Sequence, residues 1–415
     1  MSEPQNAPRL LEIVRLGGEG DGIAEGPEGP VYIPRALPGE QYAAEPDASF
    51  RLASAPSPER RATPLCPHYP ACGGCTVQHM AEPLYRTWKA GLLTAAFARA
   101  GIDIAPEPMI SVSHHSRRRA TLTGRHGPRG FVFGYYAHAS HDIVPLTACA
   151  VLHPAITSAL PLLADVAARA APRPDGEARL SVLVCREGLD LTISGGRRPA
   201  NAALLADLAR IATSGPIARI TLNGEPAVQR TRPTVRCVGV DVAPPPAAFL
   251  QAVEEAETHL AALVLEALPK RVRRIADLFA GLGTFTLALA ARAPVEAFDS
   301  DRRLVDALSA AARGARGVKP IETKVRDLFL DPLSPRELSR FDAVVFDPPR
   351  AGAKAQAEAI ARCDVARVVA VSCNPATLAR DTKIMIDAGW RMERITAVDQ
   401  FLYTPHLEVV AVLAR

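Results

Sequence analysis

The sequence predicts a multidomain α/β protein, and three observations lead to that prediction. First, its 415 residues exceed what one ordinary hydrophobic core accommodates. Second, strand-like and helical runs alternate over residues 246–415, which is typical of a Rossmann-like, doubly wound sheet. Third, the pattern of strand-like and helical runs is different upstream of residue 246. Residues 61–245 mix strands and helices as in an α+β domain, and residues 1–60 predict a small, OB-like β-barrel.

The composition is that of a globular protein, with 48% hydrophobic and 22% charged residues. A net charge of +4 is only mildly basic and indicates no class of partner by itself. No run of about 18 uncharged apolar residues is present, so no membrane contact is expected. The start, "MSEPQNAPRL", has no basic residues followed by an apolar core, which predicts a cytoplasmic protein.

The predicted elements of the N-terminal half follow from turn signals. The apolar runs "LLEIVRL", "PVYIPRAL" and "EQYAAEP" are separated by Gly- and Pro-rich turns and predict the strands of the barrel. "ASAPSPERRATP" predicts a linker, and apolar residues at helical spacing predict a helix over about 80–100. Three prolines in "DVAPPPAAFLQ" predict the next boundary.

The C-terminal alternation predicts one parallel sheet. A helix over 250–268 precedes the strand "RRIADLF", and helices then separate the strands "PVEAFD", "DAVVFDPP", "RVVAVSC" and "HLEVVAVLA". Ligands bind to such a sheet at the carboxyl ends of its strands. Residues that carry chemistry are therefore expected at those ends.

A nucleotide-containing cofactor is predicted at the first strand ends. In "IADLFAGLGTFTLALA", Gly281 and Gly283 lie in the turn after the strand and allow a ligand to approach the backbone closely. The dinucleotide fingerprint needs a third glycine where Thr286 stands, which disfavours NAD. Asp299 ends the next strand and Asp327 ends the one after, although either is also a candidate helix N-cap. Together the set looks like the S-adenosylmethionine site of class I methyltransferases.

Two further strand ends carry candidate catalytic groups. Cys373 ends the strand in "VVAVSCNP", so its thiol is expected at the ligand edge of the sheet rather than in the core. Glu408 enters the last strand in "TPHLEVVAVL" and is a candidate general base, the alternative being an exposed strand-end charge. Between them, "VVFDPPR" carries Asp347 in a loop that two prolines stiffen. Amino-methylating enzymes of this class place an aromatic residue after the prolines, where this chain has Arg350.

Cysteines and arginines outside the sheet suggest two more sites. Cys66, Cys72 and Cys75 crowd into ten residues of a chain expected in a reducing compartment, with Cys149 available as a fourth ligand. Four thiolates bind either zinc or an iron–sulfur cube, and the spacing does not separate the two. Between these cysteines, arginines precede a group of aromatic residues, which suits RNA phosphates and unpaired bases unless it is a solvated basic face. These residues are Arg117, Arg118, Arg119, Arg125, Arg129, Phe131, Phe133, Tyr135 and Tyr136.

The chain resembles the RNA (uracil-5-)-methyltransferases, and within them the iron–sulfur branch that modifies 23S rRNA. The motifs "CGGC", "DLFAGLGTFTL", "FDPPRAG", "SCNPATLARD" and "HLE" occur in the family's order and spacing. The resemblance implies a TRAM-type RNA-binding barrel at the N-terminus and a class I methyltransferase domain at the C-terminus. It implies a [4Fe-4S] cluster on Cys66, Cys72, Cys75 and Cys149. It also implies cofactor contacts from Gln251, Phe279, Thr284, Asp299, Asp327 and Asp347.

The sequence departs from the family at two places. Only 25 residues separate Glu40 from Cys66, so the barrel is shorter than usual and one of its strands is expected to be missing. Thr284 stands where asparagine is common, a change that keeps a side-chain oxygen.

The implied reaction explains why a cysteine and a carboxylate are needed. Addition of the Cys373 thiolate to carbon 6 of uracil makes carbon 5 nucleophilic, and Glu408 then removes the proton from carbon 5. One alternative is methylation of tRNA, but tRNA enzymes of this family commonly lack the cysteine cluster. A cytosine-5 enzyme would need a Pro-Cys nucleophile one strand earlier, and "FDPPR" has none. A third alternative is a non-catalytic RNA-binding or rRNA-folding protein, which the presence of both Cys373 and Glu408 disfavours.

Overall fold

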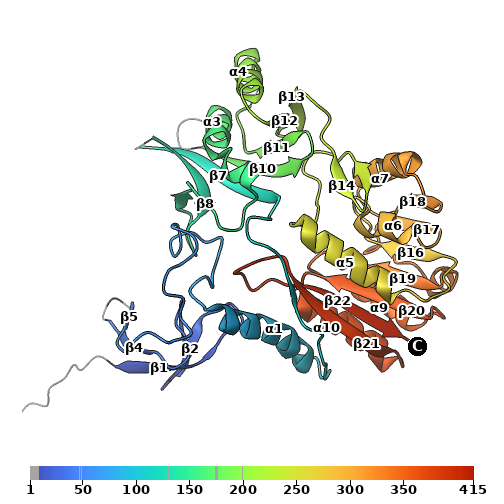
Figure 1. Ribbon diagram of the computed structural model, residues 1–415, viewed down its shortest axis with the longest axis horizontal. Coiled ribbons are helices and arrows are strands. Elements are labelled where there is room, and N and C mark those ends of the chain that lie inside the picture. Colours follow the sequence, from blue (N-terminus) through green and yellow to red (C-terminus); the bar gives the residue numbers. More distant parts are fainter. Residues whose placement is uncertain (1–8, 46, 48, 129, 173–175, 199) are drawn as a thin grey trace, which may run out of the picture.

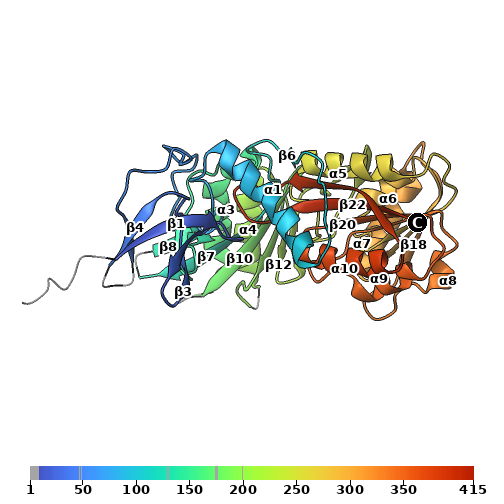
Figure 2. The ribbon, with the colours of Figure 1, turned by 90° about the horizontal axis from the view of Figure 1, so that it is seen from below.

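The computed structural model describes residues 9–45, 47, 49–128, 130–172, 176–198 and 200–415 (Figure 1). A five-stranded sheet lies at one end of the long axis and an eight-stranded sheet at the other, with a seven-stranded sheet between them (Figures 1 and 2). No described helix is long and apolar enough to cross a membrane. Residues 1–8, which include most of the terminus that predicts a cytoplasmic location, lie outside the described residues.

The N-terminal sheet is an open, antiparallel half-barrel with the strand order β3-β2-β1-β4-β5. Its strands are β1 (Leu10–Leu16), β2 (Gly22–Gly26), β3 (Gly29–Ile33), β4 (Gln41–Ala44) and β5 (Phe50–Leu52). Alternate residues of β1 are buried, so that Leu11 and Ile13 pack against Ile33 and Tyr42 in a small core. No ladder joins β3 to β5 within the part of the chain that the structure describes.

The middle sheet has the order β13-β12-β11-β10-β7-β8-β9 and is antiparallel except for the β11–β12 pair. Helices α3 (Leu160–Ala170) and α4 (Ala202–Thr213) pack their apolar stripes on one face. The opposite face carries polar side chains, including Thr121, Ser181 and Thr192, which are register neighbours. The strands are β7 (Arg119–Gly127), β8 (Gly130–Tyr136), β9 (Ile143–Pro145), β10 (Glu177–Cys185), β11 (Gly188–Ser194), β12 (Ile217–Leu222) and β13 (Glu225–Gln229), and the short helix α2 spans Pro154–Thr157. A separate hairpin, β14 (Val235–Cys237) and β15 (Val240–Val242), packs against the next domain.

The C-terminal sheet has the order β18-β17-β16-β19-β20-β22-β21-β6. Helices α5, α6 and α7 cover one face, and α1, α8, α9 and α10 cover the other (Figure 2). The strands are β6 (Ile110–Ser111), β16 (Ile275–Leu278), β17 (Val295–Asp299), β18 (Ile321–Val325), β19 (Ala343–Phe346), β20 (Arg367–Ser372), β21 (Arg391–Asp399) and β22 (Glu408–Ala414). The helices are α1 (Glu82–Arg99), α5 (Glu254–Ala267), α6 (Thr284–Leu289), α7 (Arg302–Gly314), α8 (Pro335–Leu338), α9 (Lys354–Ala361) and α10 (Pro375–Asp387).

The prediction of a uniformly parallel sheet is wrong for β22. It runs antiparallel to both of its neighbours, β20 and β21. The sequence pattern did not reveal β21, which returns the chain along the sheet edge before β22 begins. Because residues 400–407 connect β21 to β22 without a crossover helix, the chain reverses direction there. The start of β22 therefore lies at the same edge of the sheet as the carboxyl ends of the parallel strands.

The segment that follows the cysteines packs against the C-terminal sheet. Leu93 and Phe97 of α1 share a core with Leu378 of α10, and Ile110 of β6 pairs in parallel with Val398 of β21. Residues 82–111 are thus in contact with a sheet whose other strands begin at Ile275. The domain boundaries at residues 60 and 245 stay predictions.

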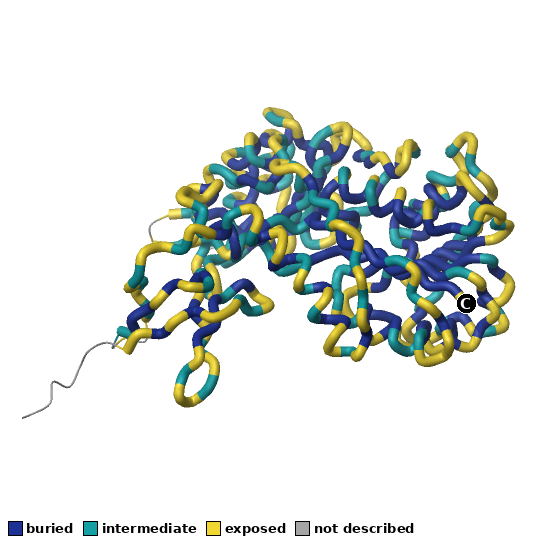
Figure 3. The backbone as a smooth tube through the Cα atoms, turned by 60° about the horizontal axis from the view of Figure 1, so that its bottom comes forward, coloured by how far each residue is buried: buried dark blue, intermediate teal, exposed yellow. Residues whose placement is uncertain are grey.

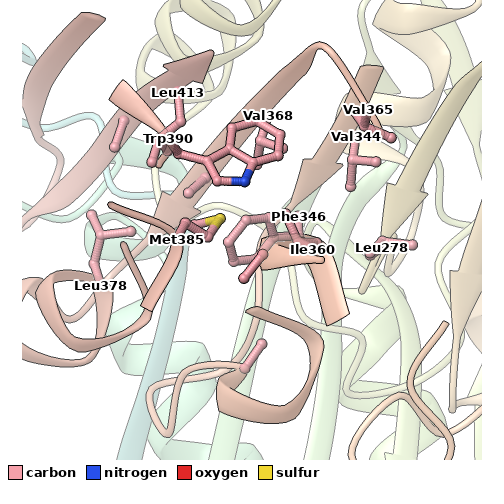
Figure 4. Close-up of a cluster of buried hydrophobic side chains, with 14 of the residues drawn as sticks. Leu278, Val344, Phe346, Ile360, Val365, Val368, Leu378, Met385, Trp390 and Leu413 are labelled. Carbon is pink, nitrogen blue, oxygen red and sulfur yellow. The ribbon is translucent and has the colours of Figure 1, made fainter. Parts of the chain in front are cut away.

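The central strands of this sheet are buried on both faces (Figure 3). On the face covered by α9 and α10, Phe346 lies among Met385, Trp390 and Ile360 (Figure 4). Phe346 is 1% exposed and immediately precedes Asp347. Close packing under the last strand residues holds the loops that follow them in defined positions.

Candidate active site

Strand register brings the predicted cofactor residues side by side. Leu278 at the end of β16 pairs with Phe298 of β17 and with Phe346 of β19. The residues that follow, Phe279, Asp299 and Asp347, therefore leave the sheet as neighbours. Asp327 follows β18 on the far side of β17, so all these strand ends lie along one edge.

The same edge brings Cys373 and Glu408 together. Ser372 of β20 is paired with Val409 of β22. Extending that antiparallel register by one residue places Cys373 directly opposite Glu408. The thiol is half-buried and the carboxyl group is 2% exposed. The alternative that Glu408 is an exposed strand-end charge is therefore wrong.

The turn after β16 is tightly held. Phe279 has a φ of 62° and Gly283 a φ of 95°, and a side chain at position 283 would collide with Leu308. The Gly281 amide donates a hydrogen bond to one Asp299 carboxylate oxygen at 2.8 Å, and the Asp301 amide donates to the other at 2.9 Å. Asp299 thus links two adjacent loops.

Neither aspartate at the cofactor end of the edge is a helix N-cap. The N-cap of α7 is Asp301, whose side chain accepts from the amide of Arg303, so that alternative is wrong for Asp299. Asp327 caps a turn instead, because its carboxylate accepts from the amides of Phe329 and Leu330 at 2.9 and 3.3 Å. Thr284 is the first residue of α6 and is half-buried.

A chain of side-chain amides connects Glu408 to Asp347. Gln400 Nε2 donates to Glu408 Oε1 at 3.0 Å and to Gln251 Oε1 at 2.6 Å. Gln251 Nε2 in turn donates to Asp347 Oδ2 at 3.4 Å. Sequence reasoning missed Gln400, because it follows a strand that the pattern did not reveal.

Burial and like charge shape the protonation of these groups. Burial, together with the nearby Asp347 carboxylate, raises the pKa of Glu408 well above its usual value. Burial alone raises the pKa of Asp347 to about 7. Burial and then the carboxylates of Glu408 and Asp347 raise the pKa of Cys373 to about 11, while the Arg350 guanidinium acts in the opposite direction. At neutral pH the Cys373 side chain is therefore a thiol.

Two other polar residues of the site were not predicted. Asp277 of β16 is fully buried and accepts a 2.5 Å hydrogen bond from the Thr286 hydroxyl, and burial raises its pKa to about 7. His406 contacts Arg350, whose Nη2 donates to His406 Nδ1 at 2.8 Å. Burial and the charge of Arg350 lower the pKa of His406 to about 4, so this ring is neutral and can accept.

Known proteins resemble this chain over nearly its whole length. A family model described as tRNA (uracil-5-)-methyltransferase matches residues 324–415. An uncharacterised RNA methyltransferase of Brucella suis is 41% identical over 98% of this chain and 97% of its own length. The 23S rRNA (uracil(1939)-C(5))-methyltransferase RlmD of Chromohalobacter salexigens is 31% identical over 98% of this chain and 89% of its own. The chain belongs to the RNA uracil-5-methyltransferase family.

A solved structure shows the same fold. The Pyrococcus abyssi tRNA (uracil-54, C5)-methyltransferase, solved with S-adenosyl-L-homocysteine, superposes with a TM-score of 0.75 over 98% of this chain and 99% of its own, at 23% identity. The protein is thus an S-adenosylmethionine-dependent RNA uracil-5-methyltransferase, and the predicted fold class and activity are confirmed. The alternative of a non-catalytic RNA-binding protein is not supported.

The four clustered cysteines of this methyltransferase line one cavity of about 300 Å³. Cys66, Cys72 and Cys75 contribute from one segment, and Cys149 from the loop after β9. Burial raises the pKa of Cys75 to about 12. Thiols alone, from two separate segments, are the donor type that an iron–sulfur cluster uses. Among the described residues, however, no three or more His, Cys, Asp or Glu side chains form a group that could hold a metal ion.

The cysteine cavity reaches residues 400–407, the connection between β21 and β22 that precedes Glu408. Gln400, Phe401 and His406 line its other side. The amides of Thr76 and Val77, directly after Cys75, donate to the Tyr403 carbonyl at 2.9 and 3.2 Å. Although distant in sequence, the cysteines and the residues around Glu408 are therefore neighbours.

The prediction that the arginine stretch contacts RNA is wrong for Arg118. This residue is 5% exposed and forms an ion pair with the buried carboxylate of Glu257 at 2.5 Å. Its Nε also donates to the backbone carbonyl of Gln251 at 3.2 Å, which supports the segment before α5. Burial excludes Arg118 from phosphate contact. Arg125 is paired with Glu177 at 3.1 Å, and Arg129 lies outside the described residues.

Arg117 and Arg119 are partly exposed, and each lies near an aromatic ring. The Arg117 guanidinium lies 5.8 Å from the ring centroid of Phe401, and that of Arg119 lies 4.3 Å from that of Phe249. Both line a second cavity of about 390 Å³ on the polar face of the middle sheet. Arg117 also lines the cysteine cavity, so the two cavities adjoin. Of the aromatic residues predicted beside them, Phe133 is buried in the core of the middle domain, while Tyr135 lines both cavities.

The structural role of Arg118 gives a testable prediction. Replacing Arg118 by methionine should lower the free energy of unfolding by about 3–5 kcal/mol, because the Glu257 carboxylate is left buried without its counter-charge. Urea denaturation measures this change. The double variant with Glu257→Leu should recover most of the loss. A loss below about 1 kcal/mol in the single variant, the range of an exposed pair, would contradict the assignment.

Proposed function

We propose that this methyltransferase modifies carbon 5 of one uridine in 23S rRNA through a covalent adduct between Cys373 and carbon 6 of the base. The observation that carries the proposal is the β20–β22 register, which sets Cys373 opposite Glu408 at the edge where the cofactor residues also end. A nucleophile and a base that face one another across a single base are what the reaction needs.

The reaction proceeds in balanced steps. Bound S-adenosylmethionine supplies an electrophilic methyl group. The Cys373 thiolate forms a bond to carbon 6, and the electrons of the C5–C6 double bond move to the carbon 4 carbonyl as an enolate. Carbon 5 of the enolate bonds to the methyl group as the bond between methyl and sulfur breaks. Glu408 takes the proton from carbon 5, the double bond re-forms, and the bond to carbon 6 breaks with its electrons on Cys373 sulfur.

The protonation states fit these roles. A carboxylate whose pKa is raised by burial is a stronger base, which suits Glu408 for accepting a proton from carbon. The raised pKa of Cys373 keeps the reactive thiolate a small fraction at neutral pH, and Arg350 is the nearby cation that favours it.

The proposed cofactor contacts come from the aligned strand ends. Each oxygen of Asp299 already accepts one backbone amide and retains a lone pair for a ribose hydroxyl. Phe279, Gly281 and Thr284 are proposed to contact the cofactor from the turn after β16, where the cofactor can approach the backbone closely. Asp327 is proposed at the adenine end, and Gln251 and Asp347 at the end nearest Cys373.

Removal of the thiol tests the covalent mechanism. Cys373→Ala should lower methylation with labelled S-adenosylmethionine at least about 10³-fold, because carbon 5 is then no longer activated. Glu408→Gln should accumulate methylated RNA bound to protein, visible as a slower band in a denaturing gel.

With the unaltered protein, the rate of adduct formation should rise about tenfold per pH unit between pH 7 and 9, because the thiolate fraction of Cys373 increases with pH below its raised pKa. Methylation by Cys373→Ala at the normal rate would exclude the proposal.

The substrate has its own test. The relative named as a 23S rRNA enzyme and the cysteines beside the catalytic loop support ribosomal RNA as the substrate. Deleting the gene should remove 5-methyluridine from one position of 23S rRNA and leave that of tRNA unchanged, as mass spectrometry of the separated RNAs would show. Expression of the unaltered protein, but not of Cys373→Ala, should restore it. Loss from tRNA instead would favour the tRNA alternative.

We further propose that Cys66, Cys72, Cys75 and Cys149 hold a [4Fe-4S] cluster, with zinc as the alternative. Their shared cavity and all-thiol character support this assignment. Such a group would brace the segment that binds the Tyr403 carbonyl, close to the RNA-facing Arg117.

Anaerobic purification tests the cluster. The protein should be brown and contain about four irons per chain. Cys72→Ser should lose the iron because one ligand is missing. Cys185→Ser, which changes a buried cysteine outside the cavity, should retain it. A colourless protein with one zinc per chain would contradict the cluster.

A further inference from the structure

We propose that Gln400 is a positioning residue for Glu408: it holds one carboxylate oxygen and leaves the other to receive the proton from carbon 5 of uracil. This inference rests on the roles proposed for Cys373 and Glu408. It concerns a side chain that is connected to Asp347 through Gln251.

The hydrogen-bond chain sets the orientation of Gln400. Gln251 Nε2 donates to Asp347 Oδ2 at 3.4 Å, which leaves the Gln251 carbonyl oxygen to face Gln400. Gln400 must then present its own NH₂, which donates to Gln251 at 2.6 Å. The second hydrogen of the same NH₂ is directed to Glu408 Oε1 at 3.0 Å. The loop that carries Asp347 thereby determines which group Gln400 offers to Glu408.

The two oxygens of Glu408 are consequently different. Oε1 is occupied by Gln400, whereas Oε2 is buried and has no hydrogen-bond partner among the described residues. A buried acceptor without a partner carries an unfavourable desolvation cost, which binding a proton relieves. Oε2 is therefore the oxygen prepared to take a proton.

Contacts on both sides of Gln400 keep it in place. Lys89 of α1 is fully buried, forms an ion pair with Asp399, and donates to the Phe401 carbonyl at 2.7 Å. The Tyr85 hydroxyl donates to the other Asp399 oxygen at 2.5 Å. With the residues before and after it bound to α1, Gln400 has little freedom to leave Glu408 when RNA enters.

A positioning role predicts a specific kinetic defect. Proton removal from carbon 5 follows both the attack of Cys373 and the transfer of the methyl group. Loss of the Gln400 amide should therefore leave adduct formation nearly intact and slow only the release of methylated RNA. A merely structural role would reduce both steps together.

The test is single-turnover methylation of total RNA from a strain that lacks the gene, with labelled S-adenosylmethionine. Gln400→Met should slow the release of methylated RNA about 10–100-fold. Total label incorporated, as adduct plus product, should form at a rate within about threefold of normal, and the KM for RNA should change little. The adduct band should appear in a denaturing gel. Gln400→Asn, which keeps a shorter amide, should give an intermediate amount of adduct and serves if the methionine variant is unstable.

Matched variants separate the possible outcomes. Gln356→Met removes another buried glutamine amide, which binds the Leu333 backbone rather than a residue of the site, and should give no adduct. If Glu408→Gln accumulates adduct and both Gln400 variants do not, the positioning role is overturned while the covalent mechanism stands. If Glu408→Gln gives no adduct either, the proposed mechanism and this inference both fail.

Discussion

The antiparallel pairing of β20 with β22 is the constraint on which the site depends. It joins two strands that are buried along almost their whole length, so a slip by one residue would turn core valines toward the wrong face. Because the register is held this firmly, the residues just past its end face one another at a defined position. The packing of the core strands, rather than the conformation of the loops, therefore determines where Cys373 and Glu408 lie relative to one another.

A second constraint comes from outside the C-terminal domain. The connection between β21 and β22 is bound by Lys89 of α1 and by the backbone of Thr76 and Val77. The buried ion pair of Arg118 with Glu257 supports the segment that carries Gln251. The N-terminal half of the chain therefore positions groups at the sheet edge that carries Cys373 and Glu408, in addition to any contact that it makes with RNA.

Electrostatics distinguishes this edge from an ordinary sheet end. Three groups that bind protons, Asp347, Cys373 and Glu408, lie at this edge, and burial raises the pKa of each. Such a site stabilises the neutral forms of these groups relative to solvent. That suits the proposed mechanism, which moves one proton off sulfur and another off carbon.

Much of this site could be predicted from the sequence because parallel strands end at one edge. The glycine turn, Asp299, Asp347 and Cys373 each follow a buried strand, and local patterns reveal such strands. Glu408 was correctly expected at the same edge, although only the antiparallel direction of β22 accounts for it. The sequence could not show β21, whose alternation is weak, and it could not show that Gln400 lies between Glu408 and Gln251.

The sequence by itself determined the alternation of strands and helices up to β20, the chemistry of the strand ends and the grouping of the cysteines, because these depend on local periodicity and residue type. Only the tertiary structure decided the direction of β22, the burial of Arg118 against Glu257, and the meeting of the cysteine cavity with the catalytic loop. Each of these is a contact between residues more than 100 positions apart or the reversal of a chain at a sheet edge. Such contacts arise from the packing of whole elements, which no local pattern encodes.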